Sequence, residues 1–352
     1  MKPLIEVKNI KCKYRGHTIV SNLSLHVNKG SLVCLLGPSG CGKTTILRAI
    51  AGFEPVYDGK ILIAGKVVSR PGYSEVPEKR QLGMVFQDYA LFPHMTVMEN
   101  VSFGLRKQTK NEQQRIAKET LDVVGMGEYG HRYPHELSGG QQQRIALARA
   151  LAPQPNAILL DEPFSNLDVE MRERLSKDVR DILKSLGITA IMVTHDQDEA
   201  FALGDNVGVM KDGKILQWDT PFNLYHEPLN RFVADFIGQG VFIDGTMVTP
   251  SEIRTEFGIV NADRAYNWPE NSPVEILLRP DDIVYDPEGP LLGKITEKAF
   301  KGAEIMYTLQ LDTGSEVLSL FPSHEDFNIG DRVGIRMDIQ HVVAFAKNAE
   351  ST

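Results

Sequence analysis

The sequence predicts an α/β domain built on a parallel sheet, followed by a smaller all-β domain. In the first part, short apolar segments alternate with stretches of helical periodicity, and the clearest apolar segments are 31–36, 157–160 and 189–194. Continuous apolar strands between helices are typical of a parallel sheet that is covered on both faces. Beyond residue 238, helical patterns become scarce and short strand-like segments lie between Gly, Pro and Asp turns. We therefore expect one domain over residues 1–237 and a second over 238–352.

Within the first domain, apolar periodicity and end signals predict the helices. The expected helical segments are 43–50, 112–124, a stretch between 140 and 153, and 166–186, and we expect a helical subdomain over about 88–155. Asp196 is a candidate N-cap, and Glu199 three residues later resembles the partner of a capping box. Asp212 and Gly213 lie between two apolar segments, which predicts a β-hairpin.

Composition excludes some classes of protein. Of the 352 residues, 42% are hydrophobic and 24% are charged, as in ordinary globular chains. The formal net charge of −8 argues against a dedicated nucleic-acid-binding protein, which normally has a basic excess. The three cysteines, Cys12, Cys34 and Cys41, lack disulfide or metal-ligand spacing, which indicates free thiols.

Nothing in the sequence predicts a membrane-spanning or secreted chain. No stretch approaches the roughly 20 apolar residues that cross a bilayer. The N-terminus carries an early acid and no long apolar region, unlike a signal peptide. We therefore expect a cytoplasmic protein, and any membrane association is expected to be peripheral.

The strongest motif follows the apolar segment 31–36. It has the pattern of Gly, four residues, Gly-Lys and then Ser or Thr, and it comprises Gly37, Pro38, Ser39, Gly40, Cys41, Gly42, Lys43 and Thr44, with Thr45 next. Glycines let backbone N–H groups surround phosphate oxygens, and the following helix directs its partial positive charge at the same anion. Lys43 is expected to reach the β- and γ-phosphates and Thr44 to bind Mg²⁺. A plain glycine turn is the alternative, and a kinase, GTPase or recombination ATPase remains open.

Two acids follow the apolar segment 157–160. Asp161 at the end of this predicted strand is a candidate Mg²⁺ ligand. Glu162 would then lie beside the γ-phosphate, where its carboxylate polarises an attacking water. A solvated acidic turn is the alternative reading of this pair.

A second glycine motif precedes the helix between 140 and 153. It comprises Ser138, Gly139, Gly140 and Gln141, and its Ser N-cap and exposed N–H groups would form another anion site. Here the chain resembles the ATP-binding-cassette (ABC) ATPase family, whose signature this is. The resemblance implies that this element meets the γ-phosphate held by the opposite subunit, so that a head-to-tail homodimer closes over two ATP molecules.

The resemblance implies roles for four further residues. Gln87 would contact Mg²⁺ and the attacking water, His195 would contact the γ-phosphate, and Tyr14 would stack on adenine. Asp168 belongs to the D-loop at 165–168, although the family more often has Ala where this chain has Asn166. Read alone, each is an ordinary surface, strand-end or core residue.

The resemblance also implies partners. Residues 89–97 look like the segment that receives a coupling helix from an integral-membrane permease, and the C-terminal domain resembles the small OB/TOBE-like β domain of importer ATPases. Arg279 and Asp281 in its most recognisable segment are expected to be a packing pair. The implied protein is peripheral on the cytoplasmic face of the membrane and works indirectly with a periplasmic or extracellular solute-binding protein.

The solute is less directly encoded. Segments 132–136 and 236–242 look most like ferric-iron importer ATPases, while polyamine, sulfate and sugar importer ATPases share much of the pattern. One competing class is a non-transport ABC ATPase of DNA repair or translation, which usually has a long coiled-coil insertion or two cassettes; this sequence has one phosphate-loop motif and no long heptad insertion. The other is a phosphotransferase, in which the signature motif at 137–141 is not expected.

Overall fold

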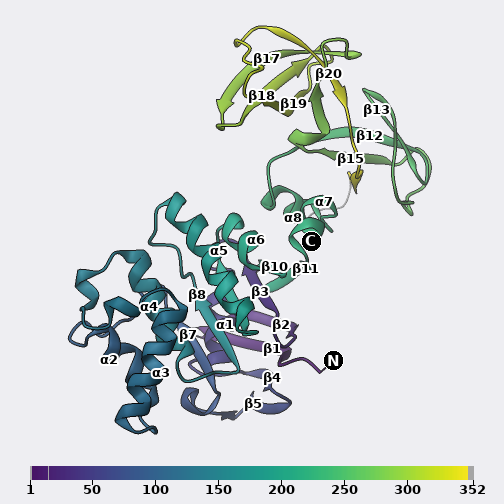
Figure 1. Ribbon diagram of the computed structural model, residues 1–352. Helices are drawn as coiled ribbons and strands as arrows, with labels where there is room; N and C mark the ends of the chain where they lie inside the picture. Colours follow the sequence, from purple (N-terminus) through teal and green to yellow (C-terminus); the bar gives the residue numbers. More distant parts are fainter. Residues whose placement is uncertain (1, 15, 348–352) are drawn as a thin grey trace. The chain divides into compact units, whose positions relative to one another are not determined.

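The computed structural model describes residues 2–14 and 16–347, which divide into two compact units between Pro221 and Phe222. The first is an α/β unit, and the second, apart from two short helices, consists of β-strands (Figure 1). The boundary predicted at 237/238 lies after these two helices. Among the described residues, no helix is long and apolar enough to cross a membrane.

The centre of the first unit is a six-stranded sheet in the order β11-β10-β3-β9-β8-β7. Neighbouring strands from β10 to β7 pair in parallel, and β10 and β11 form the predicted hairpin. The strands are β3 (Leu32–Leu36), β7 (Leu82–Val85), β8 (Ala157–Asp161), β9 (Thr189–Thr194), β10 (Asn206–Lys211) and β11 (Lys214–Asp219). Every residue of β3, β8 and β9 is buried, which explains why these strands are apolar except at the ends of β8 and β9.

A second, antiparallel sheet of the first unit has the order β2-β1-β4-β5-β6. Its strands are β1 (Ile5–Tyr14), β2 (His17–Val27), β4 (Asp58–Ile63), β5 (Lys66–Arg70) and β6 (Tyr73–Ser74). Helix α1 (Lys43–Ala51) contacts β1 and β2 of this sheet and β8 and β9 of the parallel sheet. One apolar cluster therefore joins both sheets through α1, and it includes Ile46, Ile61 and Leu159.

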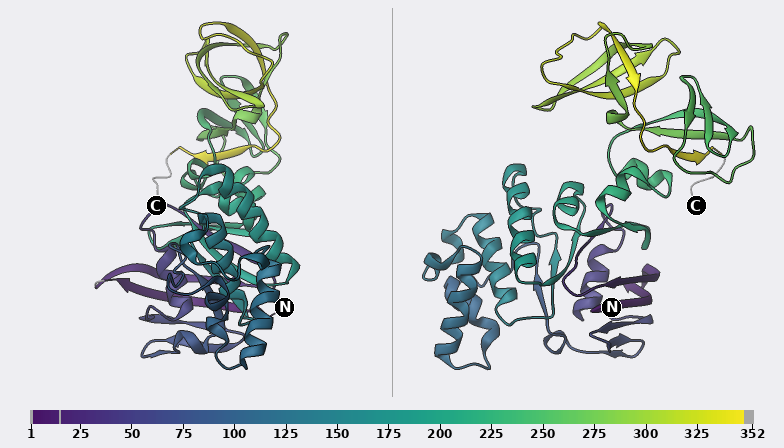
Figure 2. Two further views of the ribbon diagram at one scale, coloured as in Figure 1. Left: turned by 60° about the vertical axis from the view of Figure 1, so that its left-hand side comes forward. Right: turned by 45° about the vertical axis from the view of Figure 1, so that its right-hand side comes forward.

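The other helices of the first unit begin at polar caps. They are α2 (Val97–Ser102), α3 (Lys110–Val123), α4 (Gly139–Leu151), α5 (Val169–Ser185) and α6 (Gln197–Leu203). Helices α2, α3 and α4 contact one another and form a helical layer beside the parallel sheet (Figures 1 and 2). Helix α5 begins at 169 rather than the predicted 166, because the Asp168 side chain accepts the N–H of Met171 and caps the helix there.

The expected capping box at Asp196 and Glu199 is only half correct. Asp196 caps α6 and accepts the N–H of Glu199 at 3.0 Å. The Glu199 carboxylate does not return to the cap but accepts a hydrogen bond from Thr194 at 2.5 Å.

The second unit begins with the short helices α7 (Pro221–His226) and α8 (Arg231–Phe236). Its first sheet, in the order β14-β13-β12-β15-β21, comprises β12 (Val241–Thr249), β13 (Glu252–Thr255), β14 (Gly258–Asn261), β15 (Pro273–Leu278) and β21 (Val343–Ala346). Its second sheet, in the order β16-β20-β17-β18-β19, comprises β16 (Ile283–Tyr285), β17 (Leu291–Phe300), β18 (Glu304–Leu311), β19 (Glu316–Pro322) and β20 (Arg332–Met337). The two end strands β16 and β19 contact each other, so the second sheet curls toward a barrel.

Contacts within the second unit explain why α7 and α8 belong to it. Ala234 of α8 packs on Leu277 and Val343. The guanidinium of Arg279 donates to the carbonyl oxygen of Gly238 at 2.9 Å, and Asp281 accepts from the hydroxyl of Tyr225 at 2.9 Å. Arg279 and Asp281 thus each bond to the segment that precedes β12.

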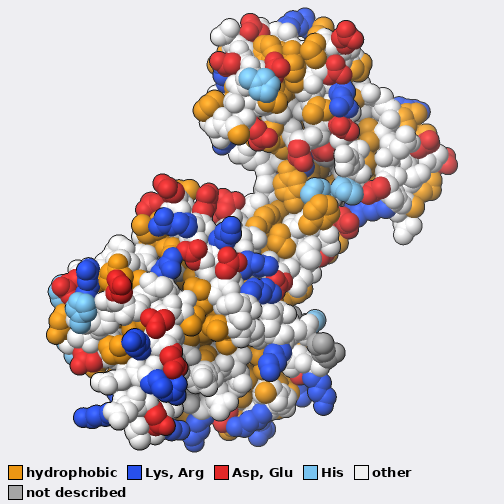
Figure 3. All heavy atoms as spheres, in the orientation of Figure 1, with side chains coloured by type: hydrophobic (Ala, Val, Ile, Leu, Met, Phe, Trp, Pro, Cys, Tyr) orange, Lys and Arg blue, Asp and Glu red, His pale blue; other side chains and the backbone are white. Residues whose placement is uncertain are grey.

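Charged side chains of both signs mix on the surface of the chain (Figure 3), and its thiols are free, as the cysteine spacing predicted. On the face shown in Figure 3, Lys and Arg side chains are interspersed with Asp and Glu over both units. Cys12, Cys34 and Cys41 are buried free thiols.

The central strand β8 gives a direct test of the core. Leu159→Ala removes a fully buried side chain from β8 and is expected to lower the free energy of unfolding by about 2–5 kcal/mol. Leu186→Ala, at a side chain that is 45% exposed, should change it by less than about 0.5 kcal/mol. Urea unfolding followed by circular dichroism measures both; equal losses would contradict the assigned core.

Candidate active site

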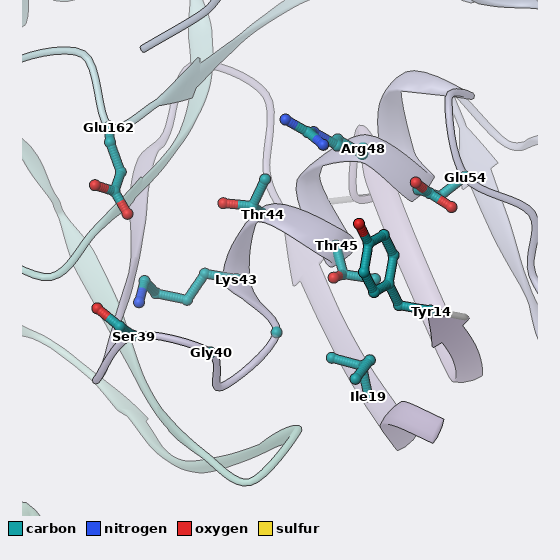
Figure 4. A pocket seen from close by; sticks show the side chains of 11 residues that line it. Tyr14, Ile19, Ser39, Gly40, Lys43, Thr44, Thr45, Arg48, Glu54 and Glu162 are labelled. Carbon is teal, nitrogen blue, oxygen red and sulfur yellow. The ribbon is translucent and has the colours of Figure 1, made fainter. Parts of the chain in front are cut away.

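A pocket of about 330 Å³ opens where the parallel sheet meets α1 (Figure 4). Eight predicted site residues line it: Tyr14, Ser39, Gly40, Gly42, Lys43, Thr44, Thr45 and Glu162. The loop after β3, the start of α1, the end of β1 and the residue after β8 thus meet around one space.

The loop between β3 and α1 has its shape because two glycines leave no room for a side chain. A Cβ atom at Gly37 would lie 2.4 Å from the backbone oxygen of Met210. Gly42 has φ +103° and caps α1, and a Cβ there would lie 2.9 Å from Val20. The close approach to β10 and β2 therefore requires glycine at both positions.

Lys43 lies inside this loop. Its side chain is 4% exposed, and its ammonium donates to the carbonyl oxygens of Gly37 at 2.6 Å and Pro38 at 3.0 Å. A buried ammonium beside the N-terminus of α1 makes this a strongly anion-attracting part of the pocket.

The oxygen atoms of Thr44 and Asp161 face each other. The Thr44 hydroxyl donates to the Asp161 carboxylate at 3.0 Å, and Asp161 is 5% exposed. Burial raises the pKa of Asp161, although the bond from Thr44 and the charge of Arg48 oppose the shift. A carboxylate and a hydroxyl are suitable oxygen ligands for Mg²⁺, which commonly takes one or two protein ligands together with substrate phosphates.

Glu162 and His195 form a pair at the sheet edge. The Nδ1 atom of His195 lies 3.2 Å from a carboxylate oxygen of Glu162, and the two side chains are 53% and 21% exposed. Glu162 has φ +45°, a left-handed conformation that is uncommon for a residue other than glycine and is often found at functional sites. Because Glu162 lines the pocket, its carboxylate can accept a hydrogen bond from a polar group bound there, and His195 can hold the carboxylate in place.

The signature residues lie elsewhere and do not line this pocket. Ser138 is the N-cap of α4, where its hydroxyl accepts the N–H of Gln141. A Cβ at Gly139 would lie 3.2 Å from Leu167, and one at Gly140 would lie 2.8 Å from Leu175. The N-terminus of α4 thus packs against the segment before α5 and against α5 itself.

Seven other predicted residues also lie outside the lining of the pocket: Gly37, Pro38, Cys41, Gln87, Asp161, Asp168 and His195. Gln87 is exposed after β7, and its backbone oxygen accepts from the Asn166 side chain at 3.0 Å. Asp168 caps α5. The Asn166 amide therefore links the segment 165–168 to the segment at Gln87.

Sequence reasoning missed three residues that line the pocket: Ile19, Arg48 and Glu54. Arg48 is four residues after Thr44 on α1, and its Nε lies 3.9 Å from the Asp161 carboxylate. Helical spacing of four could have found it. Ile19 and Glu54 carry no such signal.

Comparisons with known proteins identify the family of the chain. The ABC transporter family matches residues 20–165, and the TOBE domain family matches residues 276–345. The chain is 42% identical over 343 residues to the spermidine/putrescine import ATP-binding protein PotA of Bacteroides thetaiotaomicron, covering 95% of this chain and 72% of the relative. It is 43% identical over 318 residues to the Fe(3+) ions import ATP-binding protein FbpC of Brucella abortus, covering 88% of each.

A solved structure is also similar. It is the dimeric post-hydrolysis state of the ATP-binding cassette MJ0796 bound to ADP and Pi, with a TM-score of 0.55 and 30% identity over 61% of this chain and 98% of that one. The expected fold, an ABC ATPase unit followed by a TOBE-like β domain, is confirmed. The chain belongs to the ABC family of import ATP-binding subunits, which are ATPases coupled to transport.

Proposed function

We propose that two copies of this chain hydrolyse ATP at their shared interface and drive solute import through separate integral-membrane permease subunits. One observation carries the proposal: the chain has a pocket around the buried ammonium of Lys43 and a second helix N-terminus at Ser138 that does not line that pocket. The N-terminus of α4, a 13-residue helix, suits an anion supplied by another copy.

Each pocket would bind one ATP molecule. Tyr14, 52% exposed at the mouth of the pocket, would stack on adenine. Backbone N–H groups of residues 37–45 would surround the phosphates, and Lys43 would exchange its carbonyl partners for the β- and γ-phosphate oxygens.

Three residues fit a Mg²⁺ ion carried by the nucleotide. Thr44 and Asp161 would hold it, with the Gln87 side chain as a further oxygen ligand. The ion would supply charge neutralisation of the phosphates. Within the chain, the bond between Thr44 and Asp161 keeps both oxygen atoms at the same place.

Glu162 would accept a proton from the attacking water as general base, and His195 would hold the carboxylate and contact the γ-phosphate. The 3.2 Å contact between these side chains supports the pairing. Gln87 would orient the water from the other side. Ser138, Gly139, Gly140, Gln141 and Asp168 of the second copy would complete the site, as the dimeric assembly of the MJ0796 structure supports.

The segment 89–97 would receive the permease. Tyr89 and Ala90 both have positive φ, and the guanidinium of Arg149 on α4 donates to both of their carbonyl oxygens, at 2.8 and 2.6 Å. These two hydrogen bonds join the helical layer to the residues just after Gln87. A movement of the permease against this turn would therefore displace Gln87 in the proposed ATP site. The chain would then act peripherally at the cytoplasmic face, indirectly with a periplasmic or extracellular solute-binding protein.

Glu162→Gln tests the general base. The amide keeps the shape of the side chain but cannot take a proton, so kcat should fall about 10²–10⁴-fold while ATP affinity is kept. Glu54→Gln makes the same exchange elsewhere in the pocket and should leave kcat within a few-fold. Steady-state ATPase assays with equilibrium nucleotide binding measure both; full turnover by Glu162→Gln would refute the assignment.

Mixing two inactive variants tests the shared site. Ser138→Arg blocks the second anion site and Lys43→Ala the phosphate pocket, so each alone should be inactive. A mixed dimer keeps one intact pair of half-sites, and ATPase activity should partly return. Lys43→Ala mixed with Thr44→Ala damages both pockets and serves as the matched control. Equal inactivity in both mixtures, with mixed dimers confirmed, would exclude a shared site.

For the solute, we propose ferric iron, with a polyamine as the second candidate. The resemblance of segments 132–136 and 236–242 and the 43% identity to FbpC support iron, and the 42% identity to PotA supports a polyamine. Both are multiply charged cations.

Reconstitution of the chain with its co-purified permease and solute-binding protein separates these candidates. Ferric iron should stimulate ATP hydrolysis, whereas spermidine, sulfate and a sugar should not. If spermidine stimulates ATP hydrolysis and ferric iron does not, the proposed solute is a polyamine rather than iron.

A further inference from the structure

One arginine joins two segments that the proposed function places near the γ-phosphate. Arg172 lies in the first turns of α5, and its Nη2 donates to the carbonyl oxygen of Leu167, in the segment 165–168, at 3.2 Å. Its Nη1 donates to the carboxylate of Asp196, the residue after His195, at 2.6 Å. A single guanidinium therefore bonds to both segments.

These contacts are largely withdrawn from water. The Arg172 side chain is 24% exposed and that of Asp196 is 20% exposed. The Nε atom of Arg172 lies 3.5 Å from the carboxylate of Glu199 without a hydrogen bond to it, and Glu199 is 3% exposed. A charged pair in such surroundings is screened less than a surface pair. The planar fork of an arginine can donate to Leu167 and Asp196 at once, whereas a lysine ammonium lacks this fixed geometry.

The same network continues to the backbone on both sides of His195. The Glu199 carboxylate accepts from the Thr194 hydroxyl at 2.5 Å, and that hydroxyl accepts the N–H of Asp196 at 3.0 Å. Thr194 and Asp196 are the two neighbours of His195 in the chain. The imidazole between them lies 3.2 Å from the carboxylate of Glu162.

We propose that Arg172 is a positioning residue that fixes the segment 165–168 relative to His195, so that the two segments move together during the ATPase cycle. The inference rests on the proposed function, which assigns Asp168 to the second copy's ATP and His195 to the chain's own. Arg172 is not among the residues that line the pocket and acts through His195 and Leu167.

The same helix offers a matched control. Arg180, about two turns further along α5, pairs with Asp205 at 2.9 Å and also donates to the carbonyl oxygen of Leu203. The exposures of Arg180 and Asp205, 30% and 28%, are similar to those of Arg172 and Asp196. Arg180 thus makes the same kinds of bond to a segment without a predicted site residue.

Steady-state ATPase assays on the full-length chain compare Arg172→Lys with Arg180→Lys. Arg172→Lys should lower kcat about tenfold or more and change KM for ATP by less than about twofold, because the pocket around Lys43 is untouched. Arg180→Lys should change neither by more than about twofold, although thermal unfolding should show similar shifts in Tm for both variants. Equal kcat values in the two variants would overturn the inference.

A double-mutant cycle shows whether Arg172 acts through His195. In a His195→Ala background, Arg172→Lys should cause little further loss of kcat, because the shared interaction is already gone. If the kcat of the double variant falls by the product of the two single-variant losses, the inference is overturned. If His195→Ala alone keeps the kcat of the unmodified chain, the proposed role of His195 fails.

Hydrogen exchange followed by mass spectrometry tests the positioning role of Arg172 without an activity assay. It applies even if the His195→Ala variant hydrolyses ATP too slowly to measure. Arg172→Lys should raise hydrogen exchange in the peptide that covers 164–172 and also in the peptide that covers 193–199. Arg180→Lys should raise exchange in neither peptide. Unchanged exchange, or a rise in only one of the two segments, would overturn the inference without touching the proposed function.

Discussion

The candidate site depends on one constraint: neighbouring parallel strands end at the same edge of their sheet. Leu36 at the end of β3 pairs with Thr194 at the end of β9, and Asp161 at the end of β8 pairs with Val193. The phosphate loop, the two acids and His195 therefore leave the sheet side by side although long stretches of chain separate them. Ligands of open α/β sheets bind at such carboxyl ends.

In the proposed function, one chain supplies only half of each site. The N-terminus of α4 packs against Leu167 and α5, and its residues 138–141 do not line the pocket of the same chain. Closure over ATP would then be a population shift, since a nucleotide that contacts two copies binds the closed state more tightly than the open one. Links such as Asn166 to Gln87 and Arg172 to Asp196 join the segments that must move in that step.

Much of the fold and part of the site could be predicted because their signals are local. The glycines and Lys43 lie in one short motif, and β3 and the interior of β8 and β9 are apolar because both faces of the sheet are covered. The remainder depends on contacts between distant residues. Glu54 reaches the pocket only through tertiary packing, and the carboxylate of Glu199 bonds to Thr194 rather than completing a capping box, because Thr194 and Arg172 lie beside it. Helix α8 groups with the second unit through Ala234, Leu277 and Val343, which no local pattern reveals.

The most direct test of the two half-sites is a cross-link between chains. Ser39 in the phosphate loop and Ser138 before α4 are exposed, while the three native cysteines are buried. A short bifunctional thiol reagent added to a mixture of Ser39→Cys and Ser138→Cys chains should give a covalent dimer whose yield rises with ATP, and neither variant alone should give it. Absence of that product at saturating ATP, or an equal yield from either variant alone, would contradict a head-to-tail ATP site.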